Sequence, residues 1–438
     1  MRTPVKLLIP LAVFVAAVAL FASLNRAAGP REQAVARAPV AVLGAGAGTD
    51  ERVAALEASL RADPTTRGRG DERLSALGDA YLQRVREGGD ATGYVKAQRA
   101  FDRALRRDPR DLAATIGLGT LALARHQFKA SLILGERAVA LAPEAAAPLP
   151  VVVDALVELG RYDDAERTLQ RLVDRRPGLA AYARISYLRE LRGDVRGAVA
   201  AMRLAVDAGS STPEGAAYVH TLLGTLERNR GRLGPAVAAY RAALRAQPGF
   251  PAAGVGMAGV EASQGRADLA RARLRRIVGR TPSPESALAL AELELADGRS
   301  PESRAALALV SDQRSELRAG GENTDTEEAA FQADHGDPAE GVRLGRRAWA
   351  AAPSLRSADA LGWALTRAGR PAEGYAWSRR ALRRGWREPR VVYHAGMAAL
   401  EAGRSRVGRR LLKGLLAQNP AFSPLYAPRA RRALAGTR

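Results

Sequence analysis

The chain has 438 residues, a formal net charge of +21 and no cysteine. The missing thiols exclude disulfides, thiolate zinc sites, iron–sulfur clusters and cysteine nucleophiles. Nearly all of the positive charge is arginine, in a chain that is also rich in Ala and Gly. The sequence leaves two explanations open: a general bias of composition, or selection for an anionic partner such as nucleic acid, acidic lipid, an anionic polymer or an acidic protein.

The first predicted element is a signal or membrane-anchor segment over residues 1–26. Arg2 and Lys6 precede an uncharged run over residues 7–24, which Asn25 and Arg26 end. This layout is typical of export signals and short anchors. The run is longer than a usual signal-peptide core, and the small residues are poorly placed for cleavage, so we favour an uncleaved anchor over a cleaved signal. We expect the rest of the chain to be extracytoplasmic and anchored, or secreted if the segment is cleaved.

A linker rich in Ala, Gly and Pro follows over residues 27–49. Its glycines, Gly44, Gly46 and Gly48, faintly resemble a phosphate-binding loop. Such a loop needs a second strand that ends in an acidic residue about 20 residues later. A predicted helix over 50–62 follows instead, so we interpret this stretch as a flexible linker.

From about residue 72, a helical pattern recurs with a spacing near 34 residues. The clearest copy, His220–Pro248, contains Leu223-Gly224, Gly231, Ala236 and Tyr240. The Leu-Gly pair lets two helices approach closely, and Gly231 ends the first helix in the left-handed conformation at low cost. Pro248 stops the second helix. The pattern therefore predicts a series of helix pairs.

These residues resemble the tetratricopeptide repeat family, and the same marker returns as Leu77-Gly78, Leu118-Gly119 and Leu361-Gly362. The resemblance covers about 350 residues and implies an all-α superhelical solenoid of about ten antiparallel helix pairs. We expect about seven repeats over 50–310, about three more over 326–420 and a C-terminal cap over 421–438. Residues 311–325 are a polar insert without a helical stripe, where we expect a loop or a kink.

The resemblance also implies a concave groove that is lined by the first helix of each pair and binds a segment of a partner protein. Arg, Asn, Tyr and Trp are common at protein contacts. The candidate residues at groove positions are Tyr187, Glu190, Arg228, Asn229, Trp363, Arg367 and Tyr393. Each of them has a simpler alternative role as an ordinary exposed or packed helix residue.

Charge is uneven along the C-terminal part. Residues 312–340 hold nine Asp or Glu against two Arg, whereas residues 341–438 hold 21 Arg or Lys against four acidic residues. The candidate basic patch contains Arg379, Arg380, Arg383, Arg384, Arg387, Arg409, Arg410 and Lys413, with Trp377 and Trp386 among them. This pattern is typical of a surface that binds an acidic protein, an anionic polymer or nucleic acid. A solvated Arg-rich helix face with its Trp residues in the core explains it equally simply.

No catalytic pattern stands out. The four histidines, His126, His220, His335 and His394, lack metal-binding spacing, and there is no phosphate-binding Gly-Lys loop or nucleophile elbow. We predict a protein without catalytic residues, metal or cofactor. His220 and His394 are expected to pack in the core or groove.

Three classes of function remain. The favoured one is a scaffold that gathers partner proteins, tethered to the membrane through residues 7–24 or exported across it. The other two are forms of one alternative, a basic repeat protein that uses its Arg-rich C-terminal third: one binds an anionic cell-envelope polymer and the other binds nucleic acid. The hydrophobic N-terminus argues against nucleic acid because it predicts an extracytoplasmic location.

Overall fold

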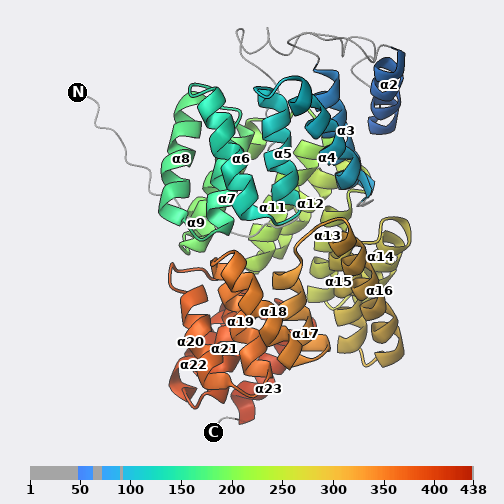
Figure 1. Ribbon diagram of the computed structural model, residues 1–438. Helices are drawn as coiled ribbons and strands as arrows, with labels where there is room; N and C mark the ends of the chain where they lie inside the picture. Colours follow the sequence, from blue (N-terminus) through green and yellow to red (C-terminus); the bar gives the residue numbers. More distant parts are fainter. Residues whose placement is uncertain (1–47, 63–71, 89–91, 437–438) are drawn as a thin grey trace, which may run out of the picture. The chain divides into compact units, whose positions relative to one another are not determined.

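The computed structural model describes residues 48–62, 72–88 and 92–436, and these residues form 22 α-helices, α2 to α23, without a strand (Figure 1). The predicted anchor over 1–26 and nearly all of the linker over 27–49 lie outside the described residues. No helix in the described part is long and apolar enough to cross a membrane.

The described residues form two compact units. We call 48–62, 72–88, 92–176 and 314–323 the N-terminal unit, and 177–313 and 324–436 the C-terminal unit. The N-terminal unit contains α2 (Thr49–Ala62), α3 (Arg73–Gly88), α4 (Thr92–Arg107), α5 (Leu112–Ala124), α6 (Phe128–Leu141), α7 (Leu149–Glu158) and α8 (Tyr162–Arg175).

The C-terminal unit begins with α9 (Leu179–Leu191), α10 (Val195–Asp207), α11 (Pro213–Asn229), α12 (Leu233–Ala246), α13 (Pro251–Ser263), α14 (Ala267–Arg280) and α15 (Pro284–Ala296). The helix α16 (Ser300–Ala319) starts in this unit and ends in the N-terminal unit. The C-terminal unit continues with α17 (Asp325–His335), α18 (Pro338–Ala351), α19 (Leu355–Arg367), α20 (Pro371–Ala381), α21 (Pro389–Glu401), α22 (Ser405–Gln418) and α23 (Tyr426–Gly436).

From α3 to α22, the helices follow one another as ten antiparallel pairs, which confirms the predicted solenoid of helix pairs. The turn inside most pairs contains a glycine in the left-handed conformation, with φ between 71° and 78° at Gly160, Gly193, Gly231, Gly265, Gly298, Gly369 and Gly403. Such a backbone costs other residues free energy, so the glycines fix where each first helix ends.

Glycines on the first helices also set the distance between helices. Tyr240 of α12 is fully buried, and its ring lies where a Cβ on Gly224 or Gly256 would be, 2.7 and 2.3 Å from ring atoms. Phe101 of α4 occupies the corresponding place against Gly78 and Gly117. On α4 and α12, a ring of the second helix thus fits between two neighbouring first helices, which approach closely as the Leu-Gly pattern predicts.

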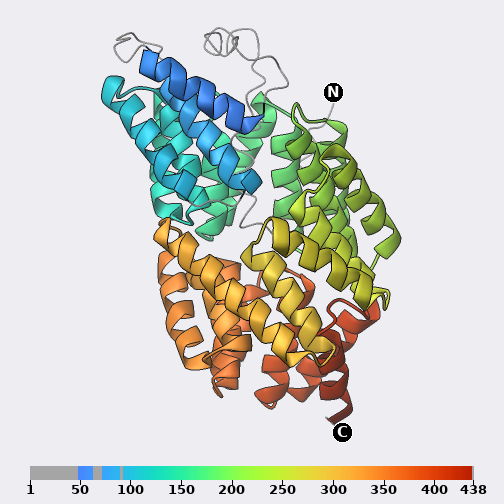
Figure 2. The same ribbon diagram turned by 90° about the vertical axis from the view of Figure 1, so that its right-hand side faces the viewer.

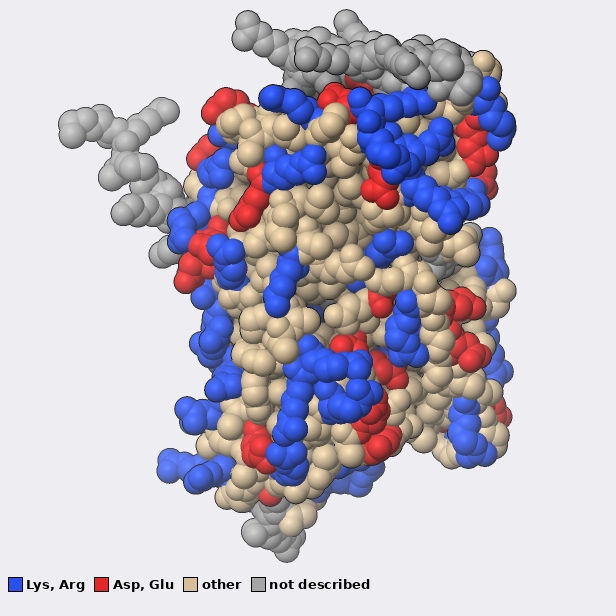
Figure 3. Space-filling view, viewed as in Figure 1, with Lys and Arg blue, Asp and Glu red and all other residues tan. Residues whose placement is uncertain are grey.

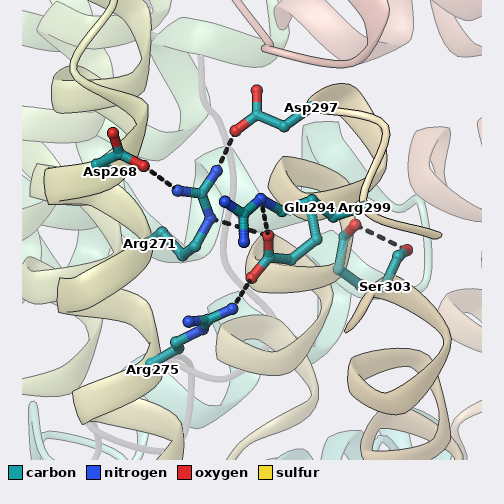
Figure 4. A network of polar contacts seen from close by, with 8 residues as sticks. Asp268, Arg271, Arg275, Glu294, Asp297, Arg299 and Ser303 are labelled. Carbon is teal, nitrogen blue, oxygen red and sulfur yellow. Dashed lines mark hydrogen bonds and ion pairs between the residues drawn. The ribbon is translucent and has the colours of Figure 1, made fainter. Parts of the chain in front are cut away.

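Buried glutamates join the pairs in the middle of the array. Glu294 of α15 is 1% exposed and accepts hydrogen bonds from Arg271 at 2.8 Å and Arg275 at 2.7 Å, both on α14 (Figure 4). The Arg271 guanidinium also binds Asp268 and Asp297. Ion pairs of this kind orient α14 against α15, because a buried carboxylate is tolerated only with charged or hydrogen-bonding partners around it.

The expectation of a loop within 311–325 is wrong for its first part, because α16 continues to Ala319. The buried stripe of this segment consists of Val310 and Arg314. An arginine in a buried position hides the stripe from a search for apolar residues. The following residues, 321–323, bind the turn between α5 and α6 within the N-terminal unit: Gln127 Nε2 donates to Gly321 O, and Asn323 N donates to Arg125 O, both at 2.9 Å.

Candidate functional site

Three of the predicted groove residues lie in the interior of the C-terminal unit. Glu190 is 3% exposed, and Trp363 and Tyr393 are 2% exposed. Tyr187, Arg228 and Asn229 are half-buried, and Arg367 is exposed. Burial raises the pKa of the Glu190 carboxyl well above its usual range, and the Glu388 carboxylate raises it further.

Trp363, Arg367 and Tyr393 come together in one aromatic cluster built from α19, α21 and α23. The Trp363 ring stacks on His394 with centroids 4.4 Å apart, and Tyr393 lies 5.1 Å from Tyr426. Arg367 sits over Trp363 at 5.7 Å. The predicted packing role of His394 is confirmed: it is buried, and its Nδ1 lies 3.0 Å from Asp359 Oδ2.

A polar network links this cluster to the first helices of earlier pairs. Arg390 of α21 donates from Nη2 to both carboxylate oxygens of Glu292 on α15, at 2.6 and 2.7 Å. The hydroxyl of the fully buried Tyr426 on α23 donates to Asp334 of α17 at 2.8 Å and lies 3.3 Å from Glu292. The chain's last helix therefore lies against α15 and α17 as well as the neighbouring α21 and α22.

Charges around this network shift two pKa values in opposite directions. Burial lowers the pKa of His335, although the Asp334 and Glu292 carboxylates oppose that effect. Burial alone would lower the pKa of Arg390, but facing Glu292, Tyr426 and Asp334 raise it overall. Arg390 therefore stays charged and His335 is neutral near pH 7.

A second set of contacts joins turns of α9–α13 to the loops after α20 and α22 (Figure 2). The buried Asn419 donates from Nδ2 to Arg228 O at 2.9 Å, and Ser263 Oγ donates to Ala421 O at 2.8 Å. A Cβ on Gly193 would lie 2.4 Å from Gly385 O. Residues 418–426 thus close the C-terminal unit onto itself, and we call these contacts, together with the Tyr426 network, the closure.

The sequence pattern gives no indication of the roles of Glu292, Asp334, Arg390 and Asn419. All four lie on elements that the repeat pattern predicts, but a local pattern carries no signal for contacts between residues some 90 to 190 positions apart. The predicted cap over 421–438 contributes Tyr426, which reaches further than the last helix pair.

The predicted basic patch divides between two second helices. On α20 and the turn after it, Arg379, Arg380 and Arg383 are exposed, and on α22 so are Arg410 and Lys413. Arg387 is exposed, and Arg384 and Arg409 are half-buried. Trp386 is buried, as a core residue would be, whereas Trp377 is half-buried beside Trp349 of α18. In Figure 3, Lys and Arg side chains gather over α18 and α19, next to a smaller group of acidic side chains.

The family model described as tetratricopeptide repeat matches residues 82–146, 153–213, 221–283 and 255–316. Together these segments cover just over half of the chain. The chain belongs to the tetratricopeptide repeat family. The matched segments end before α17, so the last three helix pairs are assigned to repeats by their pairing in the structure.

Several solved structures are similar to this tetratricopeptide repeat chain. A tetratricopeptide repeat protein from Parabacteroides merdae has 15% identity over 56% of this chain and 98% of its own, with a TM-score of 0.40. The APC/C hetero-tetramer Cut9–Hcn1 has 13% identity over 89% and 67%, with a TM-score of 0.38. The human IFIT1 dimer with m7Gppp-AAAA has 15% identity over 83% and 76%, with a TM-score of 0.38. No curated protein matches the sequence.

Proposed function

We propose that this tetratricopeptide repeat protein is a non-catalytic scaffold that binds partner proteins, tethered to a membrane or exported across it through residues 7–24. Family membership supports protein binding, because stacked helix pairs present long, regularly spaced surfaces to other chains. Among the described residues, no group of three or more His, Asp or Glu is placed to hold a metal ion. Nothing in the sequence pattern adds a nucleophile or a phosphate-binding loop.

The observation that carries the proposal is the division of surfaces in the C-terminal unit. Groove positions such as Trp363 and Tyr393 are buried by the chain's own residues. The second helices α18, α20 and α22 instead present exposed arginines and a half-buried tryptophan pair to the outside. A partner that binds this unit in its closed form therefore meets the second helices.

Crosslinking in cells tests the scaffold function. A photo-crosslinking residue incorporated in place of the exposed Arg410 on α22 reports specifically on that surface. The proposal expects discrete crosslinked protein bands that are absent when the same residue replaces Trp363 in the interior. Equal, diffuse crosslinking at both positions would contradict it.

Topology is tested separately. A reporter enzyme that is active only outside the cytoplasm is fused to the C-terminus, and cells are fractionated. Activity in the membrane fraction is expected for an anchored, extracytoplasmic scaffold, and activity in the medium for a secreted one. An inactive reporter on intact protein would contradict the proposed location.

The alternative function is binding of an anionic envelope polymer through the Arg-rich C-terminal third. The exposed cations of α20 and α22 support it, since Arg379, Arg410 and Lys413 form no ion pair with any described residue. A long polyanion would bind with a strong dependence on salt and little dependence on tryptophan. Retention on an immobilised polymer at physiological salt, unaffected by Trp377→Leu, would favour this alternative.

A further inference from the structure

Two tryptophans of neighbouring second helices form a contact on the outer surface of the C-terminal unit. The Trp349 ring on α18 lies 4.8 Å from the Trp377 ring on α20, in an edge-to-face arrangement, and both are half-buried. The Arg380 guanidinium lies 4.3 Å from the Trp377 centroid and 6.0 Å from that of Trp349. An apolar surface of two rings is therefore covered on one side by a cation.

The arginines on α18, on α20 and in the turn after α20 differ in their partners, and Arg380 lies against both rings. Arg343 binds Glu340, Arg347 binds Asp325, and Arg370 binds Glu373. Arg346, Arg379, Arg380 and Arg383 are exposed and have no acidic side chain within 4.0 Å among the residues that the structure describes. We call these four arginines with Trp349 and Trp377 the Arg–Trp face.

A guanidinium that is stacked on an indole ring is preorganised to bind a carboxylate. Stacking holds its plane in place while its in-plane N–H groups stay directed at solvent, where they match the two oxygens of a carboxylate. Exposed ion pairs alone contribute little free energy, because water and salt screen them. A cation next to a half-buried ring contributes more, since a ligand that covers the ring also displaces water from the charge.

We propose that the Arg–Trp face binds an acidic segment of a partner protein that also carries an apolar side chain. Carboxylates match the four arginines, which have no acidic side chain within 4.0 Å among the described residues, and an apolar side chain matches the pair of rings. A peptide combines both kinds of group in one segment. Acidic side chains also stand on these helices and on α17, because Glu340, Asp325 and Glu373 pair with Arg343, Arg347 and Arg370. These carboxylates disfavour a uniform polyanion that runs across the whole surface. The inference rests on the proposed scaffold function and names its partner.

The test measures fluorescence anisotropy of a labelled Glu-rich peptide with a central Leu, titrated with the full chain in detergent. The variant Arg379→Gln/Arg380→Gln/Arg383→Gln is expected to bind about tenfold or more weakly than the parent protein. The matched control is Arg241→Gln/Arg276→Gln/Arg280→Gln, which removes the same charge from exposed positions of α12 and α14. It is expected to change the affinity by less than about twofold, because those sites are far along the array and screened.

Trp377→Leu separates the ring from the charge. It keeps all four arginines, removes the surface on which Arg380 stacks, and is expected to weaken peptide binding about fivefold. Trp377→Phe, which keeps a ring, should restore most of that loss. Circular dichroism on each variant must show an unchanged helix content and unfolding midpoint, so that loss of binding reflects the face.

The results that overturn the inference are distinct from those that overturn the scaffold function. Equal weakening by both triple variants, or tight binding of polyphosphate or DNA without binding of the peptide, would show general attraction of anions and end the inference. If cellular crosslinks persist in the Arg379→Gln/Arg380→Gln/Arg383→Gln protein, the scaffold function stands and the Arg–Trp face is not its contact. If the parent protein yields no crosslinks, the scaffold function itself fails, whatever the peptide does.

Discussion

The two halves of the C-terminal unit hold their helix pairs together in different ways. In α11–α15, a buried glutamate recurs near the end of each first helix, as Glu227, Glu261 and Glu294, and each pairs with an arginine of a neighbouring helix, Arg203, Arg273 and Arg271 respectively. In α17–α23 the same role falls to stacked rings around Trp363 and Tyr426. Helix pairs of one repeat fold can thus be held together by buried ion pairs, which we call charged joints, or by stacked rings, which we call aromatic joints.

The difference matters for function because the segment that closes the unit, residues 418–426, follows the aromatic pairs and contacts the charged ones. A charged joint binds its neighbour locally, through residues about 20 positions apart in the case of Arg271 and Glu294. In the aromatic half, α23 and residues 418–421 fold back instead. They form hydrogen bonds with α15 and with the C-terminal ends of α11 and α13. The predictions below separate the two kinds of joint, in order of decreasing effect.

The largest effect is expected for Tyr426→Ala. Removing a fully buried ring costs about 3–5 kcal/mol of unfolding free energy. Urea unfolding followed by circular dichroism checks the magnitude. Hydrogen exchange should show faster exchange in 418–436 and in the turns of α11 and α13, but not in α14. Faster exchange confined to α23 would contradict the closure.

Breaking a charged joint should cost slightly less. Glu294→Ala leaves Arg271, whose side chain is 7% exposed, without its main carboxylate, and a buried charge that loses its partner costs about 3 kcal/mol. Arg271→Met/Glu294→Leu should recover most of the loss, because the charges that then lose a partner, on Asp268, Asp297, Arg275 and Arg299, are all partly or fully exposed to water. Equal instability of the single and double variants in urea would contradict this account of the joint.

Two glycines in equivalent turns separate backbone strain from the closure. Gly231 (φ 73°) and Gly369 (φ 74°) have the same left-handed conformation, but only at Gly231 would a Cβ meet another segment, 2.5 Å from Gln418 O. Gly369→Ala should cost about 1 kcal/mol from conformation alone. Gly231→Ala should cost roughly 1 kcal/mol more and loosen 418–421 in hydrogen exchange. Identical costs would place Gln418 away from this turn.

Lowering the pH should reduce the stability of the aromatic half, because His335 then takes up a proton. Its pKa is lowered in the folded state, so the unfolded state binds the proton more readily. The contribution of His335 is therefore present above about pH 6.5 and is lost as pH falls toward the folded-state pKa. Unfolding midpoints between pH 7.5 and 5 should decline more for the parent than for His335→Gln. Parallel declines would rule out His335 as the cause.

The repeat architecture could be predicted from the sequence because its determinants are local. Gly231 sits where a turn needs the left-handed backbone, and Gly224 sits where Tyr240 approaches the helix. Both requirements recur about every 34 residues. Each can be recognised within a single repeat, without knowing which other segments contact it in space. Helix α16 was missed over 311–319 because Arg314 occupies a buried position that a search for apolar residues rejects.

The closure could not be predicted because groove residues were interpreted from their position in each repeat alone. Trp363 and Tyr393 look like partner contacts on an open groove, but Trp363 stacks on His394, and Tyr393 packs against Phe422 and Tyr426 of the returning segment. Asn419 looks like an ordinary residue after a helix, yet it donates to a carbonyl on α11. Contacts between segments far apart in the sequence depend on how the pairs curve, which the repeat pattern does not specify.

Disulfide trapping tests the closure most directly, since the chain has no cysteine of its own. In Ser263→Cys/Ala421→Cys, the two new thiols are placed on residues in direct contact, since Ser263 Oγ lies 2.8 Å from the backbone carbonyl oxygen of Ala421. The matched control, Ser263→Cys/Ala435→Cys, places the second thiol at an exposed position near the end of α23. The account predicts a nearly complete intramolecular disulfide in dilute, mildly oxidised Ser263→Cys/Ala421→Cys protein and little in the control. Equal yields in both, or a disulfide that forms only between molecules, would contradict the claim that the chain closes its own groove.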